Sequence, residues 1–216
     1  MVDTVFLVRH AESIGNKAGD YGVENAERLS DRGHEQADQL AEALQDVSID
    51  AIGCSSFVRT RQTILPYLET TERVADIWAE LAEACWQAHD PSEVDELRYG
   101  EDLVLKAHEE PYFRLAPHEY PACRPPSGET FAEGLARIRL AIDRLEHVMA
   151  TSDDETLLLV SHGNYIPRLI EELVGLEPYG RFAHQNVGTT KLTRTNGADY
   201  DFRIEYVNRN PLAATL

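Results

Sequence analysis

The 216-residue chain has few cysteines and no long apolar run. Its three cysteines, Cys54, Cys85 and Cys123, are scattered and odd in number, and no motif pairs them. A disulfide-stapled secreted fold is therefore unexpected, and a reducing, cytoplasmic location is the simple interpretation. No stretch approaches the roughly 18–20 apolar residues of a membrane-spanning helix, and no signal peptide is visible at the N-terminus, so no membrane partner is predicted.

Positive charge is also scarce. The chain has 20 lysines and arginines, only three of them lysines, against 38 aspartates and glutamates, which gives a net charge of −18. Such a surface repels nucleic acid and anionic lipid at long range, so neither is expected as a partner. Adaptation to a salty cytoplasm is an alternative that composition leaves open. If the substrate is an anion, its site must build a local positive field against this background.

Two kinds of motif are missing as well. Neither an H-x-H nor an H-E-x-x-H spacing occurs, which speaks against a metallohydrolase. A G-x-x-x-x-G-K-[ST] loop is also absent, so nucleotide-driven chemistry is not expected. The sequence therefore predicts neither a metal nor another cofactor.

Apolar patterning predicts alternating strands and helices. Short stretches with apolar runs at 5–8, 49–56 and 156–164 are typical of buried strands. Apolar residues at helical spacing occupy 29–47, 57–69, 127–150 and 165–176. We expect Pro66 to bend or interrupt the second of these helices, and Thr130 with Glu133 to form a capping box before the third.

Weaker strand patterns follow at 187–194 and 201–208. Alternating β and α units predict an α/β fold, a three-layer sandwich with a mostly parallel central sheet and helices on both faces. We expect a single domain over residues 1–216.

The segment from about 84 to 128 differs from the rest. It is rich in proline, histidine, tyrosine and charge, and it predicts an insertion or lid rather than core, because loops of this length tend to be functional. Its cations, Arg98, Lys106, Arg114 and Arg124, are candidates to meet a second anionic group of a substrate.

Unusual polar residues follow three of the predicted strands. The first strand ends in Arg9-His10, the second leads to Arg59, and the third ends in His162-Gly163. Ligands of open parallel sheets bind beyond the carboxyl ends of the strands, so these side chains are expected to converge. Guanidinium groups match phosphate oxygens, and a neutral imidazole is a competent nucleophile toward phosphorus. Surrounding cations stabilise a transferring phosphoryl group, so the sequence predicts a phosphate site.

Five motifs in the same order resemble those of the histidine phosphatase superfamily, in its phosphoglycerate mutase-like branch. The stretch RHAES followed by Asn16 resembles R-H-G-E-[ST]-x-x-N, with Ala11 in place of a glycine. LSDRGHEQADQL, SSFVRTRQT, SGET and LVSHG are similar to four further family segments. The resemblance spans most of the chain and implies a phosphatase of the family's α/β fold.

The resemblance also implies roles for individual residues. His10 would be the nucleophile that becomes phosphohistidine, while Arg9, Arg59 and His162 would hold the phosphoryl group. Further contacts to the phosphate would come from the residues that match the remaining motif positions, namely Asn16 and the backbone amide of Gly163.

The acid and the substrate are less well defined. Glu83 in ELAEACW matches the family's acid/base glutamate. The glycine and the W-E-G motif that normally follow this glutamate are absent, so Glu80 stays an alternative. The implied activity is metal-independent hydrolysis of a small phosphorylated metabolite. The alternatives are a cofactor-dependent phosphoglycerate mutase and a weakly active member that binds a phospho-ligand or a protein. The oligomeric state is not predicted.

Several other polar and aromatic residues are interpreted as structural. We expect Arg61 on the surface of its helix, Glu12 as a supporting partner of the site, and Trp78 and Trp86 in packing roles. His34, His108 and His147 are expected to be solvated, whereas the roles of His89, His118 and His184 stay open.

Overall fold

The computed structural model describes residues 3–90, 92–115, 120–151, 156–195 and 202–210, so that His118 lies outside the described residues. Within them the chain forms a seven-stranded sheet in the order β4-β3-β2-β5-β1-β6-β7. The strands are β1 (Thr4–Arg9), β2 (Ala51–Cys54), β3 (Ala75–Ile77), β4 (Phe113–Leu115), β5 (Thr156–Ser161), β6 (Thr189–Arg194) and β7 (Phe202–Arg209). The helices are α1 (Ile14–Ala18), α2 (Asp31–Leu44), α3 (Val58–Thr71), α4 (Phe131–Thr151), α5 (Tyr165–Leu173) and the short 3-10 helix η1 (Ala79–Leu81).

The sheet brings the polar strand ends together. The strands from β4 to β1 are parallel to their neighbours, and β6 and β7 pair antiparallel at the other side. Arg9 of β1 lies opposite Ser161 of β5, and Cys54 of β2 lies opposite Val160, so the three strands end at one level. The predicted α/β fold with a mostly parallel sheet is confirmed.

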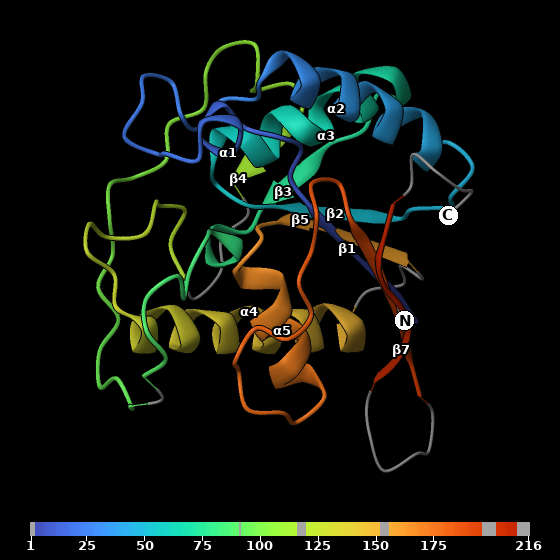
Figure 1. Cartoon of the computed structure of the whole chain (residues 1–216). Helices are drawn as coiled ribbons and strands as arrows, with labels where there is room; N and C mark the ends of the chain where they lie inside the picture. Colours follow the sequence, from blue (N-terminus) through green and yellow to red (C-terminus); the bar gives the residue numbers. More distant parts are fainter. Residues whose placement is uncertain (1–2, 91, 116–119, 152–155, 196–201, 211–216) are drawn as a thin grey trace.

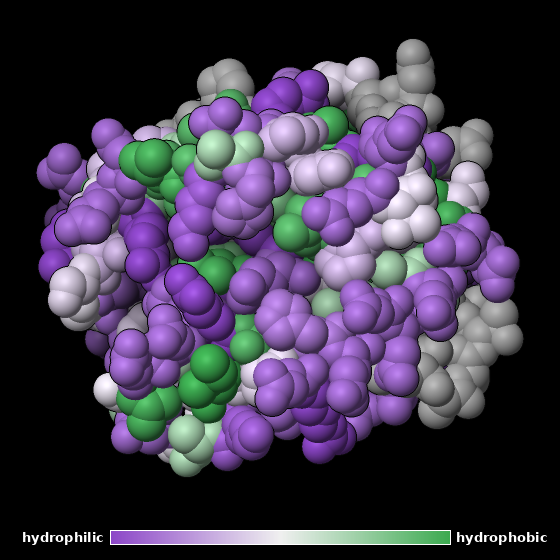
Figure 2. Space-filling model, turned by 90° about the horizontal axis from the view of Figure 1, so that it is seen from above, coloured by the Kyte–Doolittle hydropathy of each residue, from purple (hydrophilic) through white to green (hydrophobic). Residues whose placement is uncertain are grey.

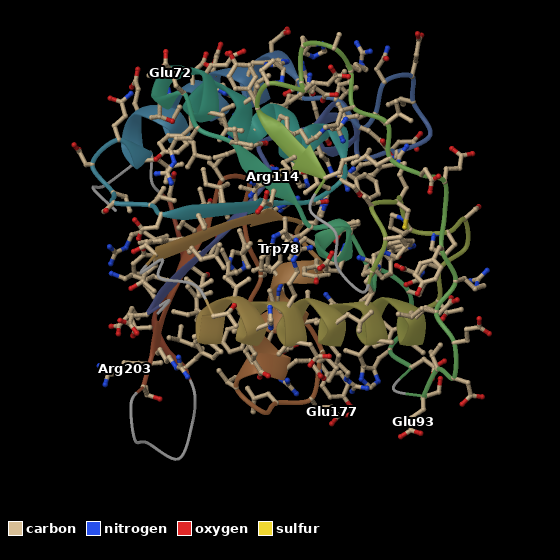
Figure 3. The ribbon with its side chains drawn as sticks, turned by 180° about the vertical axis from the view of Figure 1, so that it is seen from behind. Glu72, Trp78, Glu93, Arg114, Glu177 and Arg203 are labelled. Carbon is tan, nitrogen blue, oxygen red and sulfur yellow. The ribbon has the colours of Figure 1, made fainter. Side chains whose placement is uncertain are left out.

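Helices cover both faces of the sheet, with α2 and α3 on one side and α4 and α5 on the other (Figure 1). Alternate residues of β1 point to opposite layers, as the period of a strand requires. Phe6 and Val8 pack in the cluster of α2 and α3, and Val5 and Leu7 pack in the cluster of α4 and α5. Trp78 lies between the sheet and α4 (Figure 3), which confirms its packing role.

Two strands were not predicted, and one corrects the interpretation of 84–128 as an insertion apart from the core. β4 comes from this segment and pairs in parallel with β3 at the edge of the sheet. Each of these strands has three residues, and in β4 only Phe113 is buried. Such short stretches hold too few residues for an alternating pattern to stand out.

The helix α3 continues through Pro66 instead of breaking there. A proline inside a helix costs about 3 kcal/mol. The neighbouring turns bury Ile64 and Leu68 completely, and full burial of each such side chain contributes about 1.5–3 kcal/mol. Packing against α2 therefore offsets the local cost.

At the start of α4 the expected capping box is present. The backbone N–H of Glu133 donates to Thr130 Oγ1 at 3.2 Å, and the backbone N–H of Thr130 donates to Glu133 Oε2 at 2.8 Å. The box begins the long helix directly after the SGET motif.

The outer face over α2 and α3 is mostly hydrophilic, with apolar residues in small separate patches (Figure 2). Across the described residues, no helix combines the length and the apolar character needed to cross a membrane.

Candidate active site

The end of β1 holds Arg9 and His10 in place through the backbone. His10 N–H donates to the carbonyl of Ser161 at 2.9 Å, and Arg9 N–H donates to the carbonyl of Gly188 at 3.1 Å. Neighbouring chain on both sides therefore fixes where the two side chains leave the sheet. β1 ends at Arg9, so Arg9 and His10 stand at the edge of the sheet, where the site begins.

The hydrogen bonds of the His10 ring define its tautomer. Nδ1 lies 2.7 Å from the carbonyl oxygen of Ala11, which only accepts, so Nδ1 carries the proton. Nε2 accepts a hydrogen bond from Arg59 Nε at 3.2 Å and keeps its lone pair. Burial and the nearby Arg59 and Arg9 charges hold the pKa of His10 well below its ordinary value. The ring is therefore a neutral imidazole with a nucleophilic Nε2.

Arg9 packs tightly over Gly163 at the end of β5. Its Nη1 donates to the carbonyl of His184 at 2.6 Å. A side chain at position 163 would place a Cβ only 2.9 Å from the guanidinium carbon of Arg9, so glycine is required for this approach. Arg9 Nε is buried and has no hydrogen-bond partner among the described residues.

Arg59 reaches the site from the first turn of α3. Its guanidinium carbon lies 4.5 Å from the ring centre of Phe57 and 5.4 Å from that of Tyr21. Flat contact with aromatic faces stabilises a guanidinium and restricts its orientation. Arg59 is thereby held beside His10 Nε2.

His162 follows β5 and faces His10. The two ring centres are 5.2 Å apart, and His162 Nε2 lies 2.8 Å from the hydroxyl of Ser55. Its Nδ1 is buried and unpartnered within the described part of the chain. Burial, with Arg59 and His10 adding to it, holds the pKa of His162 well below its ordinary value. Buried polar atoms normally have partners, so the unsatisfied atoms of Arg9 and His162 mark a place for a ligand.

The side chain of Glu83, which comes from the loop after η1, lies against the N-terminus of α5. Its Oε1 accepts hydrogen bonds from the backbone N–H groups of Asn164 and Tyr165, each at 3.2 Å. Burial raises the pKa of Glu83, and the Arg59 and Arg9 guanidiniums offset part of that rise. A carboxyl group with a raised pKa beside the guanidiniums of Arg9 and Arg59 is suited to hold and release a proton.

The alternative acid, Glu80, lies elsewhere. Its carboxylate is buried and pairs with Arg144 at 2.8 Å. The guanidinium of Arg144 in turn lies 4.3 Å from the ring centre of Trp78, in the layer between the sheet and α4. The geometry favours Glu83 as the acid.

Asn16 lies beside the site within a small amide network. Its Nδ2 donates to the hydroxyl of Tyr21 at 2.8 Å, and its Oδ1 accepts from Asn186 Nδ2 at 3.2 Å. Asn186 also donates to the carbonyl of His10 at 3.0 Å. The sequence reasoning missed Asn186, which belongs to no motif and is 176 residues from His10.

Arg137 supports the loop that carries Glu83. It is fully buried and donates to the carbonyls of Glu80, Ala82 and Glu83 at 2.9, 2.7 and 3.0 Å. Glu129 pairs with it at 2.9 and 2.7 Å. The only sequence signal was the SGET motif, which includes Glu129 and ends about two helical turns before the arginine.

Glu12 has the supporting role expected of it. Its Oε1 accepts a hydrogen bond from the hydroxyl of Ser30 at 2.7 Å, and its backbone N–H donates to Gln36 at 2.8 Å. These contacts join the RHAES loop to the start of α2.

Two expectations are wrong. Arg61 is not a surface residue, because it is buried and its Nε donates to Glu109 Oε1 at 2.8 Å. The pair forms because the part of segment 84–128 that carries Glu109 packs back over α3. Trp86 is not packed either, since its exposed fraction is 53%.

The remaining histidines divide by exposure. His34, His108 and His147 are exposed, as expected. His89 stacks on Tyr179 with ring centres 4.4 Å apart. His184 is buried, with Nε2 at 2.6 Å from Thr190 Oγ1, and burial lowers its pKa to about 4.

The predicted site residues therefore fall into one arrangement, which we call the phosphate site. It consists of the guanidiniums of Arg9 and Arg59, the imidazoles of His10 and His162, Gly163 against which Arg9 packs, and the carboxyl group of Glu83 with its raised pKa. Within the described residues, histidine, cysteine and acidic side chains form no group of three or more that could hold a metal ion. The arrangement suits a tetrahedral anion and an attack by nitrogen on its central atom.

Comparison with known proteins gives the same family as the motifs. Residues 5–210 match the model of the histidine phosphatase superfamily (branch 1). The adenosylcobalamin/alpha-ribazole phosphatase of Salmonella typhi is 32% identical over 173 residues, covering 80% of each chain. "Probable phosphoglycerate mutase GpmB" of Erwinia tasmaniensis is 29% identical over 177 residues, covering 80% of this chain and 75% of that one. The crystal structure of the alpha-ribazole phosphatase from Shigella flexneri superposes with a TM-score of 0.67 at 22% identity, covering 96% of both chains.

Proposed function

Because the chain belongs to branch 1 of the histidine phosphatase superfamily, and is thus a phosphatase-type hydrolase of phosphomonoesters, we propose that it acts through a phosphohistidine on His10. The observation that carries this proposal is the state of His10 Nε2. The proton on Nδ1 leaves Nε2 with a lone pair, which accepts a hydrogen bond from Arg59 Nε at 3.2 Å. A bound phosphate would take over this donor and release the lone pair for attack.

The first step transfers the phosphoryl group to the protein. Arg9, Arg59 and His162 bind the phosphate oxygens and stabilise the charge that develops on them. His10 Nε2 attacks phosphorus while the bond from phosphorus to the ester oxygen breaks, and that oxygen leaves with the electron pair. Glu83 enters this step protonated and donates its proton to the leaving oxygen, so the product is a neutral alcohol.

The second step returns the protein to its starting state. The Glu83 carboxylate takes a proton from water, whose oxygen attacks phosphorus. The bond from phosphorus to Nε2 breaks and its electron pair returns to the imidazole, which releases inorganic phosphate. The charge on the transferring group is met by arginines, so the proposal includes no metal ion. We place this activity in the cytoplasm, which three free cysteines support.

Hydrolysis is favoured over a phosphoglycerate mutase reaction. A mutase must keep water from the phosphohistidine until the phosphoryl group returns to the substrate. A cavity of about 730 Å³, which includes Phe57 in its wall, lies beside the phosphate site and leaves room for water. This supports a small phosphomonoester as substrate and free phosphate as product.

The test is to trap the intermediate. Wild-type protein quenched in acid after mixing with ³²P-labelled phosphomonoester should carry an acid-labile, base-stable label. The variant His10→Ala should carry none, and His34→Ala, which removes an exposed histidine of α2, should be labelled like the wild type. Label on the His10→Ala variant would refute the proposal. Phosphorus NMR in the presence of 3-phosphoglycerate should show phosphate release without 2-phosphoglycerate.

A further inference from the structure

An aromatic-walled cavity of about 730 Å³ adjoins the phosphate site. We call it the aromatic cavity. Phe57 connects the two, because its ring centre lies 5.1 Å from that of His162 and its face contacts Arg59. Trp86, three residues after Glu83, also lines the cavity. The wall of the cavity thus includes one residue that contacts Arg59 and His162 and another that follows Glu83 closely in the chain. The lining residues are Glu27, Phe57, Trp86, Tyr99, Gly100, Glu101, Arg124, Pro125, Pro126, Ser127 and Gly128.

Backbone contacts join the two loops that form most of the wall. Gly100 N–H donates to the carbonyl of Arg124 at 3.1 Å, and Arg124 N–H donates to the carbonyl of Glu101 at 2.9 Å. A Cβ at Gly100 would lie 2.3 Å from the Arg124 carbonyl oxygen, so only glycine permits this approach. The cavity is thus held open by paired backbone rather than by a gap between loose segments.

The aromatic side chains of the cavity are unusually exposed. Trp86 and Tyr99 are 53% and 52% exposed, although both carry large apolar surfaces. Tyr99 is held by an edge contact with the buried Tyr120, at 5.3 Å between ring centres. Together with Phe57 they line one space. Exposed apolar surface gathered around a cavity of this size is typical of a site for a ring-bearing ligand.

The charges of the cavity oppose a second anion. The lining has two carboxylates, Glu27 and Glu101, and one cation, Arg124. Arg124 already pairs with Glu27 at 2.6 Å. The arginines at 98 and 114, which the sequence offered as further anion ligands, are likewise paired, with Glu133 and Asp76, each at 2.6 Å. A carboxylate or second phosphate on the substrate would therefore meet net negative charge.

We propose that the aromatic cavity binds the alcohol part of the substrate and that this part is a ring-bearing group without negative charge. The inference rests on the proposed function, since it takes the phosphate end to lie at His10. It assigns Trp86 and Tyr99 as specificity-determining residues. It also excludes short phosphorylated acids as preferred substrates.

The test compares three esters with the same linker: n-propyl phosphate, 3-phenylpropyl phosphate and 3-(4-carboxyphenyl)propyl phosphate. Their leaving groups are all primary alkoxides, so the demand on Glu83 is matched. We expect kcat/KM for the phenyl ester to exceed that for the propyl ester by about tenfold or more. This is the gain expected from one aromatic contact together with burial of the ring surface. The carboxylated ester should fall below the phenyl ester. A preference for the carboxylated ester would overturn the inference.

Variants assign the effect to the cavity. Trp86→Ala and Tyr99→Ala should each lower the ratio of phenyl to propyl kcat/KM by about five- to tenfold. The matched control is Tyr179→Ala, because Tyr179 is 55% exposed and is not part of the cavity wall. An unchanged ratio in both Trp86→Ala and Tyr99→Ala would overturn the inference.

A binding measurement separates this inference from the proposed function. The chain has two tryptophans, and Trp78 is buried, so a ligand in the cavity should change chiefly the fluorescence of Trp86. In the His10→Ala variant, 3-phenylpropyl phosphate should bind about tenfold more tightly than n-propyl phosphate. If none of the esters is hydrolysed but this difference in affinity is observed, only the proposed function is refuted. Hydrolysis with equal affinities would refute the cavity assignment alone.

Discussion

The phosphate site and the aromatic cavity lie side by side but are built in different ways. The phosphate site is centred on the ends of β1 and β5, where Arg9 and His10 leave backbone that is hydrogen-bonded to neighbouring chain, and Arg59 of α3 and Glu83 complete it. The aromatic cavity is formed mainly by loops between β3 and α4, at one end of the sheet (Figure 1). Chemistry that needs sub-ångström placement is thus put on the sheet, and recognition of the variable part of a substrate is put on loops.

The two regions also differ in polarity. The phosphate site is buried and carries positive charge from Arg9 and Arg59. The wall of the cavity is exposed, aromatic and slightly negative. A low-dielectric site strengthens the interaction of arginines with phosphate, whereas on our proposal the open cavity selects by shape and charge. Changes to Arg9, Arg59, His10 or His162 should therefore affect all substrates alike. A change to Glu83 should affect them according to the leaving group, and changes in the cavity should affect only selectivity.

The largest expected effect is that of His10→Ala. In enzymes that use covalent catalysis, loss of the nucleophile lowers kcat by on the order of 10⁴–10⁶-fold. The loss should be the same for propyl and phenylpropyl phosphate, while thermal stability stays near that of the wild type. A loss that differed between the two esters would mean that the regions are not separate.

Replacement of Glu83 by Gln should cost about 10²–10⁴-fold with an alkyl phosphate, because the alkoxide then leaves without a proton. The loss should be much smaller with p-nitrophenyl phosphate, whose leaving group needs little protonation. Steady-state kinetics on both substrates give the two ratios. Glu80→Gln, whose carboxyl group is away from the site, should show no dependence on the leaving group; such a dependence would reassign the acid to Glu80.

The ion pair of Arg61 and Glu109 joins α3, which carries Arg59, to the segment that forms much of the cavity. Arg61→Met leaves the buried Glu109 carboxylate without its cation and should lower the free energy of unfolding by about 3–5 kcal/mol. Arg114→Met is the matched control, since its pair with Asp76 is largely exposed and is worth about 0–1 kcal/mol. Denaturant titration measures the free energy of unfolding of both variants. Equal losses in the two variants would show that burial gives the Arg61 pair no special role in stability.

The pH dependence of kcat/KM should separate His10 from Glu83. His10 must be neutral to attack, and its pKa lies well below the ordinary value, so the acid limb should lie well below pH 6.5. Glu83 must be protonated to release an alkoxide, so activity should fall as the pH rises through its raised pKa. In Glu83→Gln the alkaline limb should vanish. Comparison of the two proteins cancels the titration of the substrate, and an alkaline limb that persists would contradict the role of Glu83.

The smallest expected effect is that of chelation. Arg9 and Arg59 supply the charge that a metal supplies in other phosphatases, so kcat should stay within about twofold after dialysis against EDTA. Vanadate should inhibit, because it adopts the trigonal-bipyramidal geometry of the transferring group. Activity that is lost on chelation and restored by zinc or magnesium would break the account of the phosphate site.

Much of the fold and most of the phosphate site follow from local sequence patterns. A run of apolar residues marks a strand, and the polar residues directly after it must lie at the carboxyl end of that strand. Once the strands are parallel neighbours, Arg9-His10 and His162-Gly163 meet without further information. The cap of α4 and the period of its apolar face are equally local. These features need only the residues within one or two turns of each other.

What only the tertiary structure decided depends on contacts between distant parts of the chain. Neither Arg61 nor Glu109 carries a local sign of burial, and they become a buried pair because a loop folds back over α3. Asn186 reaches His10 from a loop before β6, and the exposed aromatic residues share a cavity only because the backbone at 100 and 124 pairs. Sequence alone therefore determined the family and the side chains that gather at the strand ends. The tertiary structure decided how these side chains are supported and which loops form the cavity beside them, since both depend on loop packing that no local period encodes.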